Sequence, residues 1–274
     1  MKKVGIVACS DAQKEKYRAK NEELVRFLES IDYEPVLSSC IYEAEGVFSG
    51  TPKERAGQLM RMFADPDIKE IYDISGGDVA NQILDDLDYE LISKSRAVFW
   101  GYSDLTTVIN AIYAMTGKVS VLYQIKHMVY GNSVELQKER FLNRDELFSP
   151  AFRFVQKNAM KGIVVGGNIR CFLKLAGTRY FPDLHNKILL LEACGGKVPQ
   201  MATYLAQLKQ IGAFEKVSGI ILGTFTAMEQ NYCVPDIVEM VKEYARSETP
   251  IAVTRDIGHG DDAKAIVIGK EIEI

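Results

Sequence analysis

The stretch FWGYSDLTTVINAIY, from Phe99 to Tyr113, decides the fold class of this chain. A short apolar run ends in a turn that contains Gly101, and an apolar run with helical spacing follows at once. A strand that passes directly into a helix is half of a crossover unit, and crossover units join parallel strands. The stretch therefore predicts an α/β fold in which Ser103 lies at the tip of a sharp turn.

The same alternation extends toward the N-terminus. The apolar runs VGIVAC, EPVLS and IKEIYDIS alternate with amphipathic stretches of helical spacing, and we expect Val4–Cys9 to be a buried first strand. One helix start carries its own signal, because Thr51, Pro52 and Glu54 have the spacing of a capping box with proline at the first helical position. Residues 1–125 thus predict a mostly parallel sheet flanked by helices, with functional sites at the carboxyl ends of its strands.

The pattern weakens between about residues 126 and 158, where polar residues dominate NSVELQKERFLNRDELFSP. We interpret this segment as a partly helical linker. A second domain over residues 159–274 again mixes strand and helix patterns and ends in β pattern, in AKAIVIGKEIEI. Within it, the stretch QMATYLAQLKQIGAF has apolar residues at helical spacing and predicts one helix that packs on the core.

The composition excludes several classes of partner. A net charge of −4 provides no general basic field, so nucleic acid and anionic membranes are poor candidates. No apolar run reaches the roughly 20 residues that span a bilayer. The 5 cysteines are scattered, odd in number and without a CxxC pair, which argues against a metal site and a disulfide framework. We expect a cytoplasmic protein that needs no metal or cofactor.

Ser103 is the candidate nucleophile. A strand-to-helix turn lifts its hydroxyl clear of the sheet and aims the first N–H groups of the helix at an oxyanion formed beside it. Leu105 replaces the second glycine of the G-x-S-x-G pattern. The alternative is that Ser103 or Asp104 only caps the helix.

A serine nucleophile needs a base and a carboxylate that orients the base. Among the 3 histidines, His259 lies in DIGHGDD, where glycines on both sides allow close approach; a solvent-exposed turn is the alternative. His127 follows an apolar run and His185 lies in a predicted loop. Glu192 ends the apolar run of KILLLEA, where a carboxylate is costly unless it is paired; the alternative is a strand end that points into water.

A second glycine-containing turn, SGGD, contains Gly76 and Gly77 and follows a predicted strand. Its backbone N–H groups could complete an oxyanion hole or bind a phosphate, and an ordinary strand-to-helix turn is the alternative. GGN, ending at Asn168, is equally ambiguous. Cys194 has no adjacent base that would favour it over the serine as a nucleophile.

Taken together, these motifs resemble the LD-carboxypeptidase family of serine peptidases, which includes muramoyl-tetrapeptide carboxypeptidases and microcin C self-immunity proteins. The resemblance runs over nearly the full length. It is carried by KVGIVACS, DISGGDVANQILDDLDYELI, FWGYSDLTTVINAIYAMTG, GGNIRCFLKLAGTRYFPDLHNKILLLE, YLAQLKQIGAFEKVSGIILGTF and PIAVTRDIGHG. It implies an N-terminal α/β domain, a β-rich, barrel-like C-terminal domain and a site between them.

The resemblance also implies a Ser-His-Glu triad of Ser103, His259 and Glu192. Backbone N–H groups of the G-G turn at Gly76 and Gly77, together with that of Asp104, would supply the oxyanion hole. The expected substrate is a small peptide or peptide-like amide, and the usual target of the family is the bond to a terminal D-alanine in murein tetrapeptide. The resemblance further implies a homodimer.

Two departures from the family leave other functions open. ACGGKVPQMATY follows the glutamate strand without the acids and the arginine of many relatives, and VLYQIKHMVYG replaces a His-Gly-Pro stretch. The surroundings of the substrate can therefore differ from those of a murein enzyme. One alternative is a microcin-type immunity hydrolase of peptidyl or aminoacyl nucleotide analogues, and another is a family member that binds a ligand without turnover.

Overall fold

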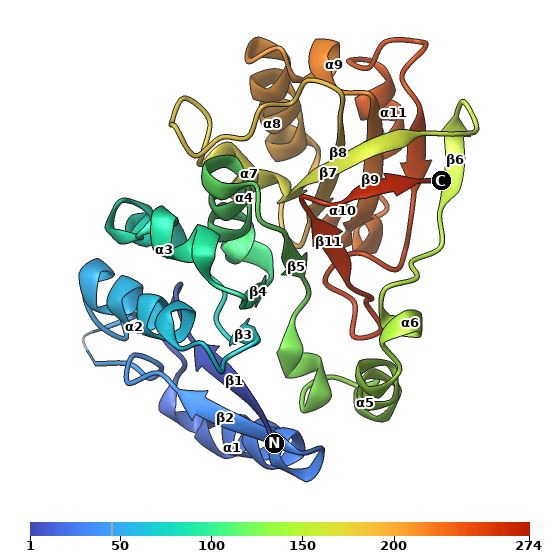
Figure 1. Ribbon diagram of the computed structural model, residues 1–274. Coiled ribbons are helices and arrows are strands. Elements are labelled where there is room, and N and C mark those ends of the chain that lie inside the picture. The colour runs from blue at the N-terminus through green and yellow to red at the C-terminus, as the bar shows by residue number, and fades with distance from the viewer. Residues whose placement is uncertain (45) are drawn as a thin grey trace.

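The computed structural model describes residues 1–44 and 46–274. Two six-stranded sheets form the frame of the molecule, the first in the N-terminal half and the second in the C-terminal half (Figure 1). The predicted mixed α/β class, with a mostly parallel first sheet and a C-terminal sheet that curls into a half-barrel, is confirmed. Among the described residues, no helix combines the length and the apolar character needed to cross a bilayer.

The first sheet has the strand order β11-β5-β4-β3-β1-β2. Its strands are β1 (Lys2–Val7), β2 (Tyr33–Leu37), β3 (Glu70–Asp73), β4 (Val98–Gly101), β5 (Ser120–Leu122) and β11 (Ile266–Ile268). The first five are parallel, whereas β11 pairs antiparallel with β5. The predicted first strand is confirmed, and from Val4 to Cys9 every residue is buried. The carboxyl ends of β1, β3 and β4 therefore lie side by side.

Short helices connect these strands. They are η1 (Glu15–Tyr17), α1 (Arg18–Ser30), α2 (Pro52–Ala64), η2 (Ala80–Asp86), α3 (Tyr89–Lys94), η3 (Ser103–Leu105) and α4 (Thr106–Thr116). The predicted capping box is confirmed, because Thr51 Oγ1 accepts from the Glu54 N–H at 3.2 Å and the Glu54 carboxylate accepts from the Thr51 N–H at 2.8 Å. The predicted linker, residues 126–158, covers most of η4 (Ile125–Met128) and all of α5 (Val134–Leu142), α6 (Arg144–Leu147) and β6 (Arg153–Gln156).

The second sheet has the order β12-β7-β8-β9-β10-β6. Four parallel strands, β7 (Lys161–Asn168), β8 (Lys187–Ala193), β9 (Gly219–Phe225) and β10 (Ile251–Val253), form its centre. Its antiparallel edges are β6 and β12 (Glu271–Glu273). The helices of this half are α7 (Ile169–Leu173), α8 (Val198–Gln210), α9 (Ala213–Lys216), α10 (Thr226–Gln230) and α11 (Ile237–Lys242). The single helix expected over residues 200–214 is wrong, because Gly212 adopts a left-handed φ of 72° and separates α8 from α9.

Helix α4 joins the two halves of the molecule. The Asn110 side chain donates to the Gly166 carbonyl and accepts from the Gly166 N–H, both at 2.9 Å, and all these atoms are buried. Thr106 Oγ1 accepts from the Asn168 N–H at 3.1 Å. A Cβ at Gly167 would lie 2.8 Å from Thr106 Oγ1, so glycine allows β7 to approach the helix this closely. The start of α4, which follows Ser103, is thereby fixed against the carboxyl end of β7.

Candidate active site

The turn after β4 holds Ser103 in an unusual backbone conformation. Its φ is 55°, in the left-handed region that non-glycine residues rarely occupy. Gly101 makes the turn possible, since a Cβ there would lie 2.6 Å from Leu105 Cβ. Strain of this kind persists only where the surroundings enforce it, and it concentrates at functional sites. The turn has the form of a nucleophile elbow even though Leu105 stands where the pattern has glycine.

The helix-cap interpretation of this turn is wrong. Neither η3 nor α4 has a side-chain hydrogen bond at its N-cap in the described structure. The Asp104 carboxylate is fully buried and is used elsewhere: Oδ2 accepts from Ser10 Oγ at 2.7 Å and from the Ala80 N–H at 2.8 Å. Its Oδ1 lies 2.5 Å from Lys174 Nζ. Asp104 thus ties the turn to its neighbours, and the Ser103 hydroxyl takes no part in the cap.

Glu192 is the last residue but one of β8 and is completely buried, so the interpretation as a carboxylate pointing into water is also wrong. Its Oε2 lies 2.7 Å from His259 Nδ1. Two further groups donate to the same carboxylate: Asn168 Nδ2 to Oε1 at 3.0 Å and Tyr102 Oη to Oε2 at 3.2 Å. A carboxylate with three donors is compensated for its burial, and it fixes the orientation of the imidazole.

Tyr102 brings the histidine loop to the serine turn. The Tyr102 and His259 rings pack with centroids 4.8 Å apart, and Tyr102 directly precedes Ser103 in the chain. Burial first, and then the charge of Glu192, raise the pKa of the Tyr102 phenol, so it stays protonated and donates. Gly258 has a φ of 158°, and a Cβ there would lie 1.7 Å from Thr224 Oγ1, so the loop packs directly on the end of β9.

The second glycine turn lies beside the first, at the end of β3. Gly77 has a φ of 125°, and a Cβ there would meet the Asp11 carboxylate at 2.1 Å. Asp11 Oδ1 accepts from the Asp78 N–H at 3.0 Å, and the Gly76 carbonyl accepts from the Asp11 N–H at 3.2 Å. No acceptor among the described residues bonds the Gly77 N–H. This N–H is therefore available at the edge where the nucleophile turn ends.

Some residues of this cluster were missed or left ambiguous by sequence reasoning. Asn168 was one of three residues in an ambiguous GGN, and Tyr102 and Lys174 were not singled out. A signal for Asn168 existed, because it ends one apolar run as Glu192 ends the next, and the two residues are register partners in neighbouring parallel strands. The other two act through tertiary contacts that the local sequence does not encode.

The other two histidines do not join the triad candidates. His185 is exposed and pairs with Asp183 at 2.6 Å. His127 lies in η4, where burial lowers its pKa to about 4, so its imidazole is neutral at pH 7.

We predict that His127→Gln makes stability less dependent on pH. Since the unfolded histidine has an ordinary pKa of 6.5 and the folded one about 4, the unfolded state binds the proton more tightly. The wild type then loses stability as pH falls from 6.5 to 4, by at most about 3 kcal/mol. Urea unfolding at pH 7 and at acid pH measures this loss, with the exposed His185→Gln as a control that should match the wild type. Equal losses in the wild type and His127→Gln would contradict the prediction.

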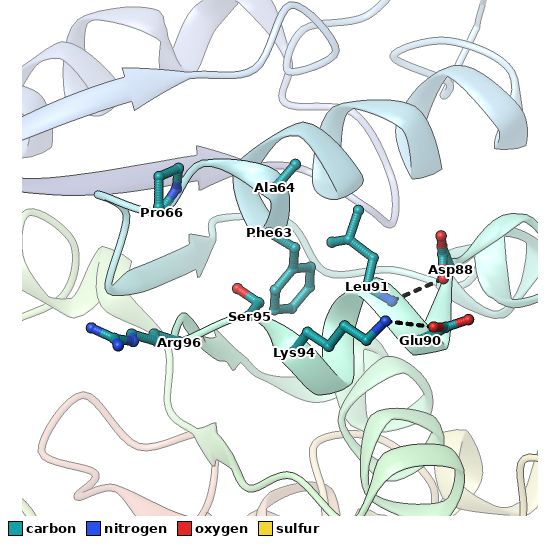
Figure 2. Close-up of a pocket in the computed structure, with 9 residues that line it drawn as sticks. All are labelled: Phe63, Ala64, Pro66, Asp88, Glu90, Leu91, Lys94, Ser95 and Arg96. Carbon is teal, nitrogen blue, oxygen red and sulfur yellow. Dashed lines mark hydrogen bonds and ion pairs between the residues drawn. The ribbon is translucent and has the colours of Figure 1, made fainter.

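A pocket of about 520 Å³ opens beside His259. Its walls come from the end of β9 with α10 and from the histidine loop: Thr224, Thr226, Glu229, Gln230, Arg255, His259, Gly260, Asp261 and Asp262. A hollow of about 790 Å³ lies elsewhere, between the end of α2 and α3 (Figure 2). Two hydrogen bonds lie within its lining: Lys94 pairs with Glu90 at 2.5 Å, and the Asp88 carboxylate accepts from the Leu91 N–H at 2.9 Å. It contains no member of the serine, glutamate and histidine cluster, so size does not identify the active site here.

Family models match most of the chain. A model described as the LD-carboxypeptidase N-terminal domain matches residues 4–124, and one described as the LD-carboxypeptidase C-terminal domain matches residues 161–274. The chain belongs to the LD-carboxypeptidase family. Its members are serine peptidases, and the resemblance stated from the motifs is confirmed.

Two curated relatives carry the names of the two branches. The protein named "Probable murein peptide carboxypeptidase" from Bacillus subtilis is 27% identical over 284 residues, which cover 97% of this chain and 86% of the relative. The microcin C7 self-immunity protein MccF of Escherichia coli is 26% identical over 235 residues, covering 73% of this chain and 68% of MccF.

Solved structures of LD-carboxypeptidase relatives show the same fold. MccF in its apo state superposes with a TM-score of 0.86 at 23% identity, covering 99% of this chain and 92% of MccF. MccF in complex with aspartyl sulfamoyl adenosine gives a TM-score of 0.84 at 21% identity over the same shares. The muramoyltetrapeptide carboxypeptidase of Oxalobacter formigenes gives 0.80 at 22% identity, covering 99% and 94%.

Proposed function

We propose that this chain is a serine carboxypeptidase that removes a terminal D-amino acid from a murein-derived tetrapeptide. The observation that carries the proposal is the 2.7 Å pair of Glu192 and His259, packed through Tyr102 against the turn of Ser103. A buried carboxylate that orients an imidazole beside a serine on a strained turn is the arrangement of serine hydrolases. The family relationship and the named murein relative support the same activity.

The proposed reaction begins with proton transfer. Nδ1–H of His259 donates to Glu192, which leaves Nε2 able to take the proton of Ser103 Oγ. Oγ then adds to the scissile carbonyl carbon, and the negative oxygen is held by the N–H groups of Gly77 and Asp104. Nε2–H gives its proton to the leaving amine, so the C–N bond breaks and the D-amino acid departs. Water, activated by the same histidine, then hydrolyses the ester on Ser103.

A second substrate class is favoured by two exposed residues, one in the pocket of His259 and one in the hollow that adjoins it. Arg255 lies in the pocket of the histidine, and Tyr232, whose side chain is 89% exposed, lines the adjoining hollow of about 810 Å³. An aromatic ring and a guanidinium suit the base and the phosphate-like linker of an aminoacyl nucleotide analogue. MccF, solved with such an analogue, has this fold. The same triad would then cleave an amide in a nucleotide conjugate.

Product analysis separates the two substrates. We expect the wild-type chain to release D-alanine from murein tetrapeptide, detected by mass spectrometry, and to label on Ser103 with a fluorophosphonate. Hydrolysis of an aminoacyl sulfamoyl adenosine without D-alanine release would favour the second class. A folded chain that cleaves neither and resists the probe would be a ligand-binding member of the family and would contradict the proposal. The cytoplasmic location and the homodimer stay predictions.

A further inference from the structure

Two cationic side chains of the C-terminal half reach the two turns that flank the proposed reaction centre. Lys174, the C-cap of α7, places Nζ 2.5 Å from Asp104 Oδ1 and donates to the Asp78 carbonyl at 2.8 Å. Arg170, one helical turn earlier, pairs with the Asp78 carboxylate and donates to the Gly77 carbonyl at 3.2 Å. One short segment therefore contacts both turns at once.

The contact of Lys174 with Asp104 is the more buried of the two. Asp104 has no exposed side-chain surface and Lys174 keeps 20%, whereas Arg170 and Asp78 keep 42% and 63%. Because the other oxygen of Asp104 is already used by Ser10 and Ala80, the carboxylate is held from three directions. Removing the ammonium would take away the counter-charge of this buried carboxylate and also the bridge from it to the Asp78 carbonyl, so the two turns could shift relative to each other.

The backbone that would move carries the proposed oxyanion donors. Asp104 supplies one N–H through its own backbone, and Gly77, the other donor, directly precedes the residue whose carbonyl binds Lys174. The same segment begins at Asn168, which holds Glu192 at 3.0 Å. The chain from Asn168 to Lys174 therefore contacts Glu192, which orients His259, and also contacts the two turns that carry the proposed oxyanion donors.

We propose that Lys174 is a positioning residue that aligns the N–H groups of Gly77 and Asp104 for transition-state binding. This inference rests on the proposed serine peptidase function. Lys174 acts through the Asp104 carboxylate and the Asp78 carbonyl, and its ammonium is occupied by them. An alternative role, direct binding of a substrate carboxylate by this ammonium, would affect ground-state binding and therefore KM.

The test replaces Lys174 by methionine, which keeps the length of the side chain and removes the charge. We expect kcat to fall about 100-fold, the size of effect that a displacement near 1 Å produces, with KM nearly unchanged. Lys174→Arg keeps a cation within reach of Asp104 and should recover most of kcat. Lys3→Met is the matched control: Lys3 also forms a partly buried ion pair, 2.6 Å from Asp65, but at the opposite end of the first sheet.

Each outcome decides the inference. Wild-type kcat in Lys174→Met, or a raised KM with unchanged kcat, overturns it while the proposed function stands. A wild-type chain that neither labels with fluorophosphonate nor releases product overturns both. If Lys174→Met does not fold, Lys174→Arg and the double variant Lys174→Met with Asp104→Asn, which removes the stranded charge, take its place. A folded double variant with wild-type kcat overturns the inference, and one with low kcat and unchanged KM supports it.

Discussion

Replacement of Ser103 by alanine should lower kcat by about 10⁶-fold for whichever substrate the wild-type chain cleaves. The proposed reaction has no other nucleophile, because His259 and Glu192 only move and orient a proton. The folded state should survive, since alanine meets no more strain than serine at a φ of 55° and the Ser103 hydroxyl caps neither η3 nor α4. Steady-state kinetics and a thermal melt measure both expectations.

Cys194→Ala is the control for this prediction. Cys194 is exposed and lies two residues after Glu192, so it is the thiol closest in sequence to the proposed triad. Partial burial of the thiol, and then the charge of Glu192, raise its pKa, which works against a reactive thiolate. We expect Cys194→Ala to keep the wild-type rate and the fluorophosphonate label. Retained activity in Ser103→Ala together with lost activity in Cys194→Ala would transfer the nucleophile to the cysteine.

The sequence predicted the elements that depend on local pattern. Strands such as Val98–Gly101 and caps such as Thr51 follow from apolar runs and from side chains three residues apart, which act within one element. The place of Ile266–Ile268 did not follow in this way. These three residues belong to the last part of the chain, yet they pair with β5 of the first sheet. Such pairing is decided by tertiary packing, which a three-residue pattern does not encode.

The candidate site also contains residues that local sequence patterns predict and residues that only tertiary packing brings together. Ser103, Glu192 and His259 were predictable as candidates because each lies in a turn or at a strand end with a distinct local signature. The residues that position these three were harder to predict, because Lys174, for example, lies 70 residues from Asp104 in the chain. Pairing over that separation depends on how α7 packs against α4 and η3, and single-sequence patterns carry no record of it. The structure therefore reveals mainly the residues that position the site, whereas the reacting residues were already candidates from the sequence.

Glu192→Gln should lower kcat by about 10⁴-fold with little loss of stability. Glutamine has the shape of glutamate, but the NH2 group of its amide donates hydrogen bonds at a position where the carboxylate oxygen accepted them. Three donors converge on this carboxylate, from His259, Asn168 and Tyr102. When the amide N–H of glutamine faces His259, it donates to Nδ1 and favours the tautomer with the proton on Nε2. A protonated Nε2 cannot take a proton from Ser103. The imidazolium also loses its counter-charge.

Glu70→Gln is the matched control for this variant. Glu70 also lies on a strand and accepts from a tyrosine hydroxyl, Tyr72 at 2.8 Å, and from Lys2 at 2.6 Å. It begins β3, however, whereas Glu192 lies near the carboxyl end of β8. We expect it to keep wild-type kinetics, because the amino ends of the first sheet face away from the proposed reaction centre. A Glu192→Gln variant that stays folded and keeps kcat within tenfold of the wild type would show that the imidazole needs no buried carboxylate. The triad would then reduce to a serine and a histidine, with Glu192 retained for packing alone.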